Sequence, residues 1–303
     1  MKVEKTAYAG WPNCYKVSNG EIELIATSDI GPRIMRFGFV GGKNLFAEFQ
    51  AELGKSGESK WMPRGGSRLW KSPEDTVLTY ALDNGPVQVT VLADGLTLTQ
   101  PVEPESGLQK QITVHMSPTG TNVTVLHRIT NTGGWAITFS SWVLTMMAPG
   151  GTAFTGFPPR GKHPEVLDPT NPLVMWAYTN LGDPRWKFTP KYLSLRQDPK
   201  NPEPQKLGMF NPQTWGAYLL GSDLFVKRYE ADPSADYPDF GCSFETFTND
   251  VFLELETVGP LTNVGPAEYV EHVESWSLHK GISIPEITDA ALDAVFEPIL
   301  SRP

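Results

Sequence analysis

The sequence predicts an all-β protein built from many short strands, and three observations support this prediction. Gly (28 residues) and Pro (27 residues) are frequent among the 303 residues, while charged residues make up only 19%, a composition typical of strands joined by tight turns. Runs of alternating apolar and polar residues follow one another along most of the chain. Several are separated by dipeptides suited to type I′ hairpin turns, namely Asn19-Gly20, Asn84-Gly85 and Asp94-Gly95.

The first half of the chain reads as a series of such strands. Gly41-Gly42 closes one of them, and turns at residues 118–120 and 132–134 divide a plausible meander. Residues 48–61 are polar and predict an exposed loop. The predicted strands are 14–17, 21–27, 33–40, 76–82, 87–92, 96–100, 109–116, 122–130 and 135–146.

The pattern changes between residues 148 and 212, where Pro and Gly recur every few residues and only 173–178 and 192–196 look like strands. Long irregular stretches in compact proteins usually carry function or are covered by their own packing, so we expect elaborate loops over one face. The strands then resume at 215–220 and 223–229. No repeat or linker divides the sequence, and we expect a single domain over residues 1–303.

One helix is predicted, near the end of the chain. Thr288 is suited to cap its start, and Leu292, Val295 and Phe296 share one face. Pro298 is expected to end it, because proline lacks the backbone donor that a helix interior needs.

The region 240–278 contains three predicted strands, 243–248, 251–258 and 269–278. Glu254 and Glu256 stand two residues apart on the middle strand, so period-2 alternation places both on one face and the neighbouring leucines on the other. Two carboxylates there need water, a cation or a ligand, because an unpaired buried charge is costly. This strand is therefore where we expect chemistry.

Composition and motifs exclude several classes of function. The formal net charge of −9 argues against nucleic acid or an anionic membrane as the main partner, and no apolar run is long enough for a spanning helix. The first residues lack the apolar core of a signal peptide, so we expect a cytoplasmic protein. Cys14 and Cys242 predict two free buried thiols. With no phosphate-binding loop, dinucleotide fingerprint or Ser-His-Asp arrangement, we expect no cofactor and no metal, Glu254 with Glu256 being a minor alternative as ligands of a hard cation.

Four segments resemble the galactose mutarotase-like (aldose 1-epimerase-like) superfamily. GPRIMRFGFVGGKNLFAE resembles its opening hairpin, RGGSRLWKSPED its substrate-side loop and FLELETVGPLTNVGPAEYVEHVESWSL its closing strands, with NTGGWAITFSSWVLTMMAPGG between them in the expected order. GGSRLWKSPED together with LELETVGPL is similar to an uncharacterised bacterial branch of that superfamily. The resemblance implies a β-supersandwich of two large antiparallel sheets, with a sugar-sized cleft on the concave face.

The resemblance also implies an activity. Glu256 matches the family's general base, which takes the anomeric hydroxyl proton while an acid protonates the ring oxygen. Typical mutarotases use a histidine as the acid, but the matching strand here has Trp142 and Thr145 near that place, and Arg64 stands where a second histidine is common. Two hypotheses therefore remain: an aldose 1-epimerase-like enzyme acting on a sugar or sugar derivative, or a non-catalytic carbohydrate-binding protein on the same fold. The oligomeric state stays open.

Other polar residues are candidates for the site. The missing acid would be His163 or an arginine such as Arg68, which either binds substrate or pairs with Glu74. Trp70 is either a stacking platform for a sugar ring or a core aromatic. A lyase or hydrolase using Glu254 with Glu256 is disfavoured, because carboxylates on one strand face are too parallel to flank a bond. Further substrate-binding candidates, each with a structural role as the alternative, are Glu74, Asp183, Arg185, Asp239, Glu245 and Glu254. Structural roles are expected for His115, His127, His272 and His279.

Overall fold

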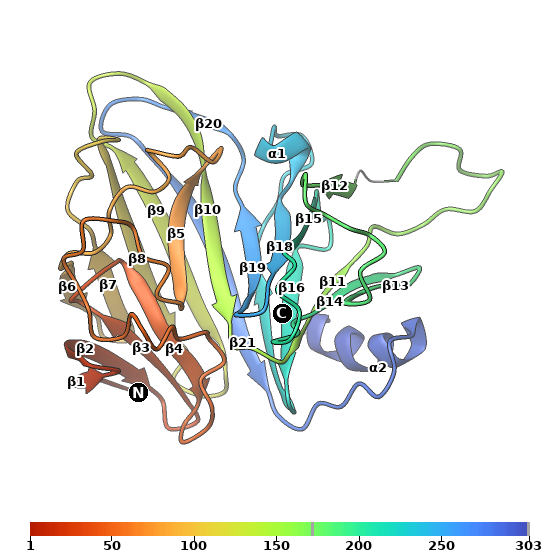
Figure 1. Ribbon diagram of the computed structural model, residues 1–303, viewed down its shortest axis with the longest axis horizontal. Coiled ribbons are helices and arrows are strands. Elements are labelled where there is room, and N and C mark those ends of the chain that lie inside the picture. The colour runs from red at the N-terminus through yellow and green to blue at the C-terminus, as the bar shows by residue number, and fades with distance from the viewer. Residues whose placement is uncertain (171–172, 302–303) are drawn as a thin grey trace.

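The computed structural model describes residues 1–170 and 173–301, and these residues form two large antiparallel sheets, a short helical turn and one longer helix (Figure 1). The first sheet contains β1 (Lys2–Tyr8), β2 (Trp11–Ser18), β3 (Ile22–Thr27), β4 (Arg33–Phe39), β5 (Ser67–Ser72), β10 (Ile137–Met147), β12 (Leu173–Met175), β15 (Gln205–Met209), β18 (Phe244–Thr248), β19 (Leu253–Val258) and β20 (Thr262–Val264). Its order is β1-β2-β3-β4-β5-β10-β19-β18-β15-β12, and β20 pairs with β10.

The second sheet contains β6 (Gln88–Val91), β7 (Gly95–Thr99), β8 (Leu108–Met116), β9 (Val123–Asn131), β11 (Thr152–Gly156), β13 (Trp186–Phe188), β14 (Tyr192–Arg196), β16 (Trp215–Leu220), β17 (Asp223–Arg228) and β21 (Tyr269–His279). Its order is β13-β14-β11-β16-β17-β21-β9-β8-β7-β6. The helical elements are α1 (Pro238–Gly241) and α2 (Asp289–Leu300). The all-β prediction with two large antiparallel sheets is therefore confirmed.

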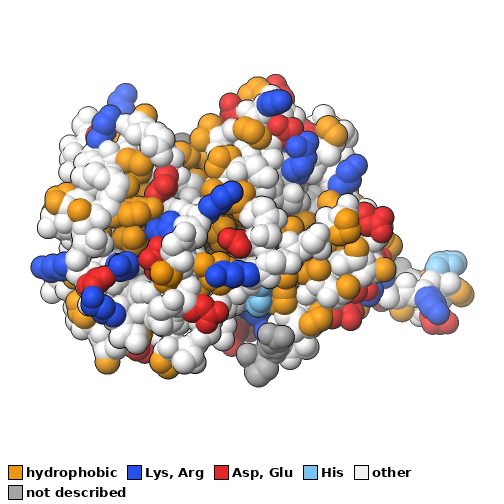
Figure 2. Space-filling view, turned by 90° about the horizontal axis from the view of Figure 1, so that it is seen from below, with side chains coloured by type: hydrophobic (Ala, Val, Ile, Leu, Met, Phe, Trp, Pro, Cys, Tyr) orange, Lys and Arg blue, Asp and Glu red, His pale blue; other side chains and the backbone are white. Residues whose placement is uncertain are grey.

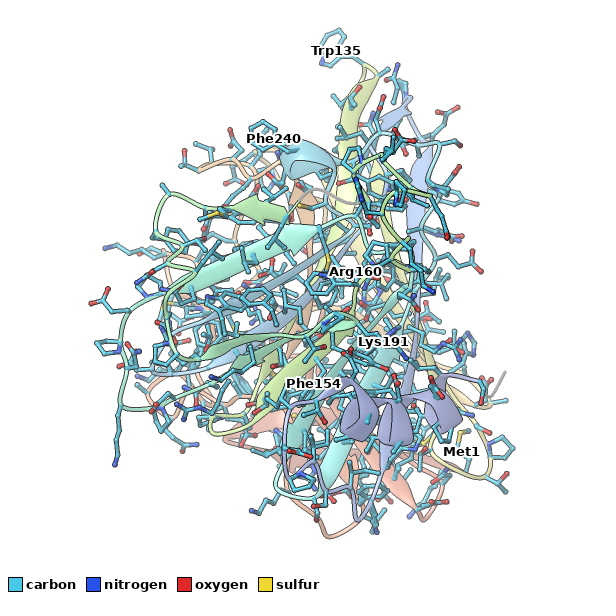
Figure 3. The ribbon with its side chains drawn as sticks, turned by 90° about the vertical axis from the view of Figure 1, so that its right-hand side faces the viewer. Met1, Trp135, Phe154, Arg160, Lys191 and Phe240 are labelled. Carbon is cyan, nitrogen blue, oxygen red and sulfur yellow. The ribbon has the colours of Figure 1, made fainter. Side chains whose placement is uncertain are left out.

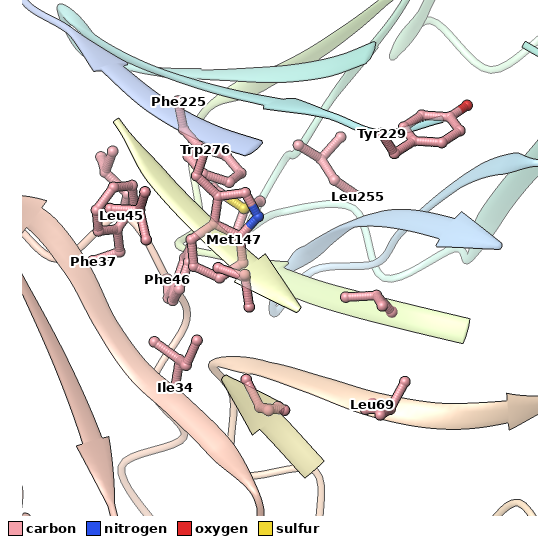
Figure 4. Close-up of a cluster of buried hydrophobic side chains, with 14 of the residues drawn as sticks. Ile34, Phe37, Leu45, Phe46, Leu69, Met147, Phe225, Tyr229, Leu255 and Trp276 are labelled. Atoms are coloured by element: carbon pink, nitrogen blue, oxygen red, sulfur yellow. The ribbon is translucent and has the colours of Figure 1, made fainter. Parts of the chain in front are cut away.

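Aromatic side chains from both sheets meet in the sandwich core (Figure 4). The ring of Phe37 on β4 lies 5.9 Å from that of Phe225 on β17 and 5.6 Å from that of Trp276 on β21. Phe46, in the loop after β4, adds edge-to-face contacts to both Phe225 and Trp276. Burying each such side chain contributes roughly 1.5–3 kcal/mol to the free energy of folding, so this cluster helps to hold the two sheets together.

The helix α2 packs on the second sheet, where Phe154 and Lys191 lie beside it (Figure 3). Its Phe296 ring lies 4.8 Å from Trp215 and 5.5 Å from Phe154. Thr288 caps the first turn as predicted, accepting a hydrogen bond from the amide of Ala291. The prediction that Pro298 ends the helix is wrong: α2 continues to Leu300, and the amide of Ser301 donates to the carbonyl of Glu297 at 3.0 Å.

The strand predicted at residues 76–82 is also wrong. Asp75 Oδ1 accepts hydrogen bonds from the amides of Val77 and Leu78, and the amide of Thr79 donates to the Asp75 carbonyl. These local bonds give the backbone a turn, which outweighs the strand propensity of the apolar residues. Conversely, residues 67–72, expected as part of a loop, form β5 in the middle of the first sheet.

Within the described residues, no helix is long and apolar enough to cross a membrane. Acidic and basic side chains are interspersed on the face shown in Figure 2. The described segment that follows β11, residues 157–170, projects from the body on the right of Figure 1. Residues 160–170 of this segment are all exposed.

Candidate functional site

Strands β5, β10, β19, β18 and β15 place polar and aromatic side chains on the face of the first sheet that points away from the sandwich core. Alternation is the cause, because Leu253 and Leu255 of β19 are fully buried in the core, with Leu255 shown in Figure 4. Glu254 and Glu256 therefore share the opposite face, as the sequence predicts.

The strand register brings distant residues into one row across this face. Leu144 of β10 is opposite Arg68 of β5 on one side and Glu256 of β19 on the other. Glu256 is in turn opposite Glu245 of β18. Side chains in one row of neighbouring strands lie within contact range, so Arg68, Glu256 and Glu245 belong to one patch.

The next rows add the remaining members. On one side Trp142 of β10 is opposite Trp70 of β5. On the other side Phe247 lies between Glu254 of β19 and Lys206 of β15. We use the name polar cluster for Arg68, Lys206, Glu245, Glu254 and Glu256.

Arg68 and Glu254 form one half of the polar cluster. Arg68 Nη2 lies 3.3 Å from Glu254 Oε1, and both side chains are almost buried. The guanidinium carbon lies 4.4 Å from the ring centre of Trp70 and 5.1 Å from that of Trp61. The Nε and Nη1 atoms of Arg68 have no hydrogen-bond partner within residues 1–170 and 173–301. Both atoms are buried, and a buried donor without a partner is an unsatisfied group that a ligand could satisfy.

Lys206 forms the other half. Its Nζ lies 2.7 Å from Glu245 Oε2 and 2.9 Å from Glu256 Oε2, and the faces of Trp142 and Trp176 cover it at 4.8 and 4.5 Å. Trp142 Nε1 also donates a 2.8 Å hydrogen bond to Glu256 Oε2. Gly208 leaves the room that Glu245 occupies, since a Cβ there would lie 3.2 Å from Glu245 Cγ and 2.6 Å from Cys242 Sγ.

Burial and the neighbouring charges perturb the pKa values of the polar cluster. Burial raises the pKa of Glu254 to about 7 against the opposing effect of Arg68. It also raises the pKa of Glu245 well above its usual value. Burial alone would lower the pKa of Lys206, but Glu245 and Glu256 raise it well above its usual value. One ammonium serves two carboxylates, so a proton retained on Glu245 relieves their repulsion.

Aromatic rings border the polar cluster on the β5 side. Trp70 lies 5.5 Å from Trp142, 5.0 Å from Trp61 and 4.8 Å from Tyr80, measured between ring centres. Trp61 and Tyr80 are only partly buried, and the Nε1 donor of Trp61 has no partner in the part of the chain that the structure describes. Carbohydrate sites combine such apolar faces with nearby polar groups, because a sugar ring has an apolar face and a rim of hydroxyls.

The structure brings together most of the candidates taken from the sequence. Arg68, Trp70, Glu245, Glu254 and Glu256 are all in or beside the polar cluster. Two further candidates lie at its margin. Asp239 is half-buried, and its pKa is raised by burial and lowered by Lys206. Glu74 is exposed and accepts a 2.6 Å hydrogen bond from Tyr80. Arg68 pairs with Glu254 and not with Glu74.

Three candidates have other surroundings. Arg185 is fully buried and pairs with Asp183 at 2.8 Å, and its remaining donors bond to the carbonyls of Asn201 and Glu203. Asp183 and Arg185 therefore have the structural role that the sequence analysis gave as the alternative to substrate binding. His163 is exposed in the projecting segment between β11 and β12, so the structure does not bring it to Glu256.

Sequence reasoning missed Lys206. The available signal was a short run, Gln205–Met209, in which one lysine stands beside apolar residues in a Pro-rich region. Trp61, Tyr80 and Trp176 were also missed, because they lie in loops that only the fold brings to the face. A separate groove of about 1380 Å³ lies between α2 and β17, β21 and β9. It contains none of the polar cluster, whose paired charges and perturbed carboxylates make it the stronger candidate site.

No family model and no curated protein matches the sequence. Solved structures do match. A candidate aldose 1-epimerase from Klebsiella pneumoniae has a TM-score of 0.63 at 11% identity, over 98% of this chain and 86% of that one. A candidate aldose 1-epimerase from Escherichia coli K12 has 0.61 at 12%, over 88% and 99%. A galactose mutarotase-like protein from Lactobacillus casei has 0.58 at 9%, over 88% and 100%. The chain therefore has the fold of the galactose mutarotase-like superfamily.

Proposed function

We propose that the polar cluster binds a sugar and catalyses proton transfer at its anomeric centre, as an aldose 1-epimerase does. The observation that carries this proposal is the contrast between Glu254 and Glu256. They project from one strand face, yet one has a pKa raised to about 7 and the other is held by two donors. Two carboxyl groups with different environments are suited to the roles of acid and base.

Glu256 is the proposed base. Trp142 Nε1 and Lys206 Nζ both donate to its Oε2, and its Oε1 has no hydrogen-bond partner among the described residues. That free oxygen would accept the proton of the anomeric hydroxyl. The bond between C1 and the ring oxygen then breaks as the hydroxyl oxygen forms the aldehyde carbonyl.

Glu254 is the proposed acid and takes the place of the family's histidine. A carboxyl group whose pKa is raised to about 7 retains its proton at a higher pH than an ordinary glutamate and would give that proton to the ring oxygen. The hydroxyl and ring oxygens are both bonded to C1, so acid and base on one strand can serve them from one side. Rotation about the C1–C2 bond and reversal of both transfers yield the other anomer.

Arg68 and Trp70 would bind the sugar. The unpaired Nε and Nη1 atoms of Arg68 are donors for sugar hydroxyls, and the indole of Trp70 has a face for the apolar side of the ring. Orientation by such groups matters because proton transfer requires heavy-atom distances of about 2.6–3.2 Å.

A non-catalytic carbohydrate-binding protein is the second candidate. One observation favours it: Glu256 is completely buried, whereas Glu254 is 7% exposed. A sugar held at Glu254 and Arg68 without reaching Glu256 would bind and not react.

Anomeric exchange measured by NMR with a panel of aldoses separates these functions. We expect the protein to accelerate exchange, and both Glu256→Gln and Glu254→Gln to abolish the acceleration with little change in melting temperature. Glu165→Gln, at an exposed position, is the matched control. Calorimetric binding of a sugar without any acceleration would support the second candidate. Neither binding nor acceleration across the panel would refute both.

A further inference from the structure

A buried ion pair lies inside the sandwich beneath the strand that carries the two carboxylates. Lys227 on β17 and Glu274 on β21 are both fully buried, and their Nζ and Oε1 atoms are 2.7 Å apart. Both residues belong to the second sheet, and their charges face the first sheet across the core.

The pair is bonded directly to the first sheet. Lys227 Nζ donates to the carbonyl of Leu255 at 3.2 Å and to Thr145 Oγ1 on β10 at 3.0 Å. Thr257 Oγ1 donates to Glu274 Oε1. Leu255 and Thr257 alternate along β19 with Glu254 and Glu256, so the pair holds β19 at the two residues that flank Glu256.

Among the described residues, Lys227 and Glu274 are the only charged groups at this place in the core, because the groups around them are neutral. Trp276 Nε1 donates to Glu274 Oε2 at 2.7 Å, and His272 Nε2 lies 2.9 Å from Thr257 Oγ1. Burial lowers the pKa of His127 and His272 to about 4, so both are neutral at pH 7. Burial alone would raise the pKa of Glu274, but Lys227 lowers it to about 2.

Stability alone does not account for this arrangement. Taking two charges out of water is costly, and replacing a buried ion pair by apolar residues of similar volume is often neutral or stabilising. A buried pair does, however, specify geometry, because each charged partner demands its hydrogen bonds in fixed positions.

We propose that the Lys227–Glu274 pair is a positioning device, which holds β19 through Leu255 and Thr257 and so sets where the Glu254 and Glu256 carboxylates lie on the opposite face. The inference depends on the proposed function only for the catalytic roles of those carboxylates. Their positions can be measured without any sugar.

The test is the titration of Glu254, followed by NMR in protein labelled with ¹³C at glutamate carboxyl groups and assigned with Glu254→Gln. The groups that face Glu254 are Arg68, Lys206 and Glu256, and all are retained in the variants. The double variant Lys227→Met/Glu274→Met removes both buried charges together. We expect the Glu254 midpoint to fall by at least one pH unit toward its ordinary value, because a loosened β19 admits water, while the melting temperature stays within a few degrees.

Two further variants make the result decisive. Thr257→Val keeps the ion pair and removes one of its bonds to β19, so it should lower the midpoint in the same direction by a smaller amount. Arg128→Met/Glu271→Met removes a partly exposed pair that bridges β9 and β21 and should leave the midpoint unchanged. An unchanged Glu254 midpoint in Thr257→Val and in a folded double variant would overturn the proposal. If the double variant does not fold, Thr257→Val alone decides.

Sugar turnover gives an independent readout. A shifted Glu254 midpoint in a protein that does not accelerate anomeric exchange would support the positioning role and reject the proposed function. Normal turnover in Glu256→Gln would likewise reject that function and leave the titration result standing.

Discussion

Lys206 Nζ lies 2.9 Å from Glu256 Oε2, between the indole faces of Trp142 and Trp176. The ammonium therefore donates a hydrogen bond to a carboxylate and makes cation–π contacts with two indole rings. Such an environment keeps the lysine charged although it is almost fully buried.

Removing this cation should destabilise the protein strongly. Lys206→Met leaves Glu245 and Glu256 buried with no cation beside them, and breaking a buried pair from one side costs about 3–5 kcal/mol. Urea unfolding at pH 7 measures the loss. Lys191→Met is the control, because its partner Asp293 lies near the surface and an exposed pair contributes about 1 kcal/mol or less. Equal losses in the two variants would contradict the assigned role of Lys206.

The free energy of unfolding should carry a Glu254 contribution that decreases as the pH rises. The pKa of Glu254 is raised from 4.5 to about 7 in the folded protein. Its contribution is therefore fully present below pH 4.5 and is lost as the pH rises through 7, a change on the order of 3 kcal/mol. Glu254→Gln should remove this change, measured by urea unfolding at several pH values between 4.5 and 8. An unaltered pH profile in the variant would show that Glu254 is ionised throughout.

His127 should act in the opposite sense. Burial lowers its pKa from 6.5 to about 4, so its contribution is present above pH 6.5 and is lost as the pH falls through 4. We expect His127→Phe to reduce the loss of stability between pH 7 and pH 5, measured by denaturant unfolding. His115→Phe, at a partly exposed position on β8, is the matched control. If His127→Phe loses as much stability between pH 7 and pH 5 as the wild type does, groups other than His127 cause the acid sensitivity.

The charge of the site predicts which sugars bind. The two cations of the polar cluster, Arg68 and Lys206, are already paired, Arg68 with Glu254 and Lys206 with Glu245 and Glu256. A neutral aldose should therefore bind at least about tenfold more tightly than its 6-phosphate, a difference of about 1.4 kcal/mol, because a phosphate would lose its hydration without gaining an uncommitted cation. Titration calorimetry with glucose, galactose and their 6-phosphates tests this. Tighter binding of the phosphates would reject the assignment of the site to neutral sugars.

Local pattern was enough to predict much of the fold. The alternation of β19 places Glu254 and Glu256 correctly, since the intervening leucines have only one apolar environment available, the sandwich core. Turn dipeptides such as Asn19-Gly20 and Asp94-Gly95 mark hairpins that the structure contains, β2 with β3 and β6 with β7.

The partners within the site could not be read from local pattern. Arg68 was paired with Glu74, six residues away, as one of two alternatives, whereas its partner is Glu254, 186 residues away. Lys206 meets Glu245 and Glu256 only because three strands align in one register. Short-range rules describe propensity and period, while the choice of strand neighbours depends on the topology of the whole sheet.

The spacing of β5 and β19 along the chain has a consequence for biosynthesis. The contact between Arg68 and Glu254, 186 positions apart, can form only after residue 254 has left the ribosome. Until then β10 lacks its neighbour β19 and leaves one edge of the first sheet unpaired, and chains dominated by such distant pairings fold slowly. The nascent protein must therefore shield its unpaired edges from other chains while translation is completed.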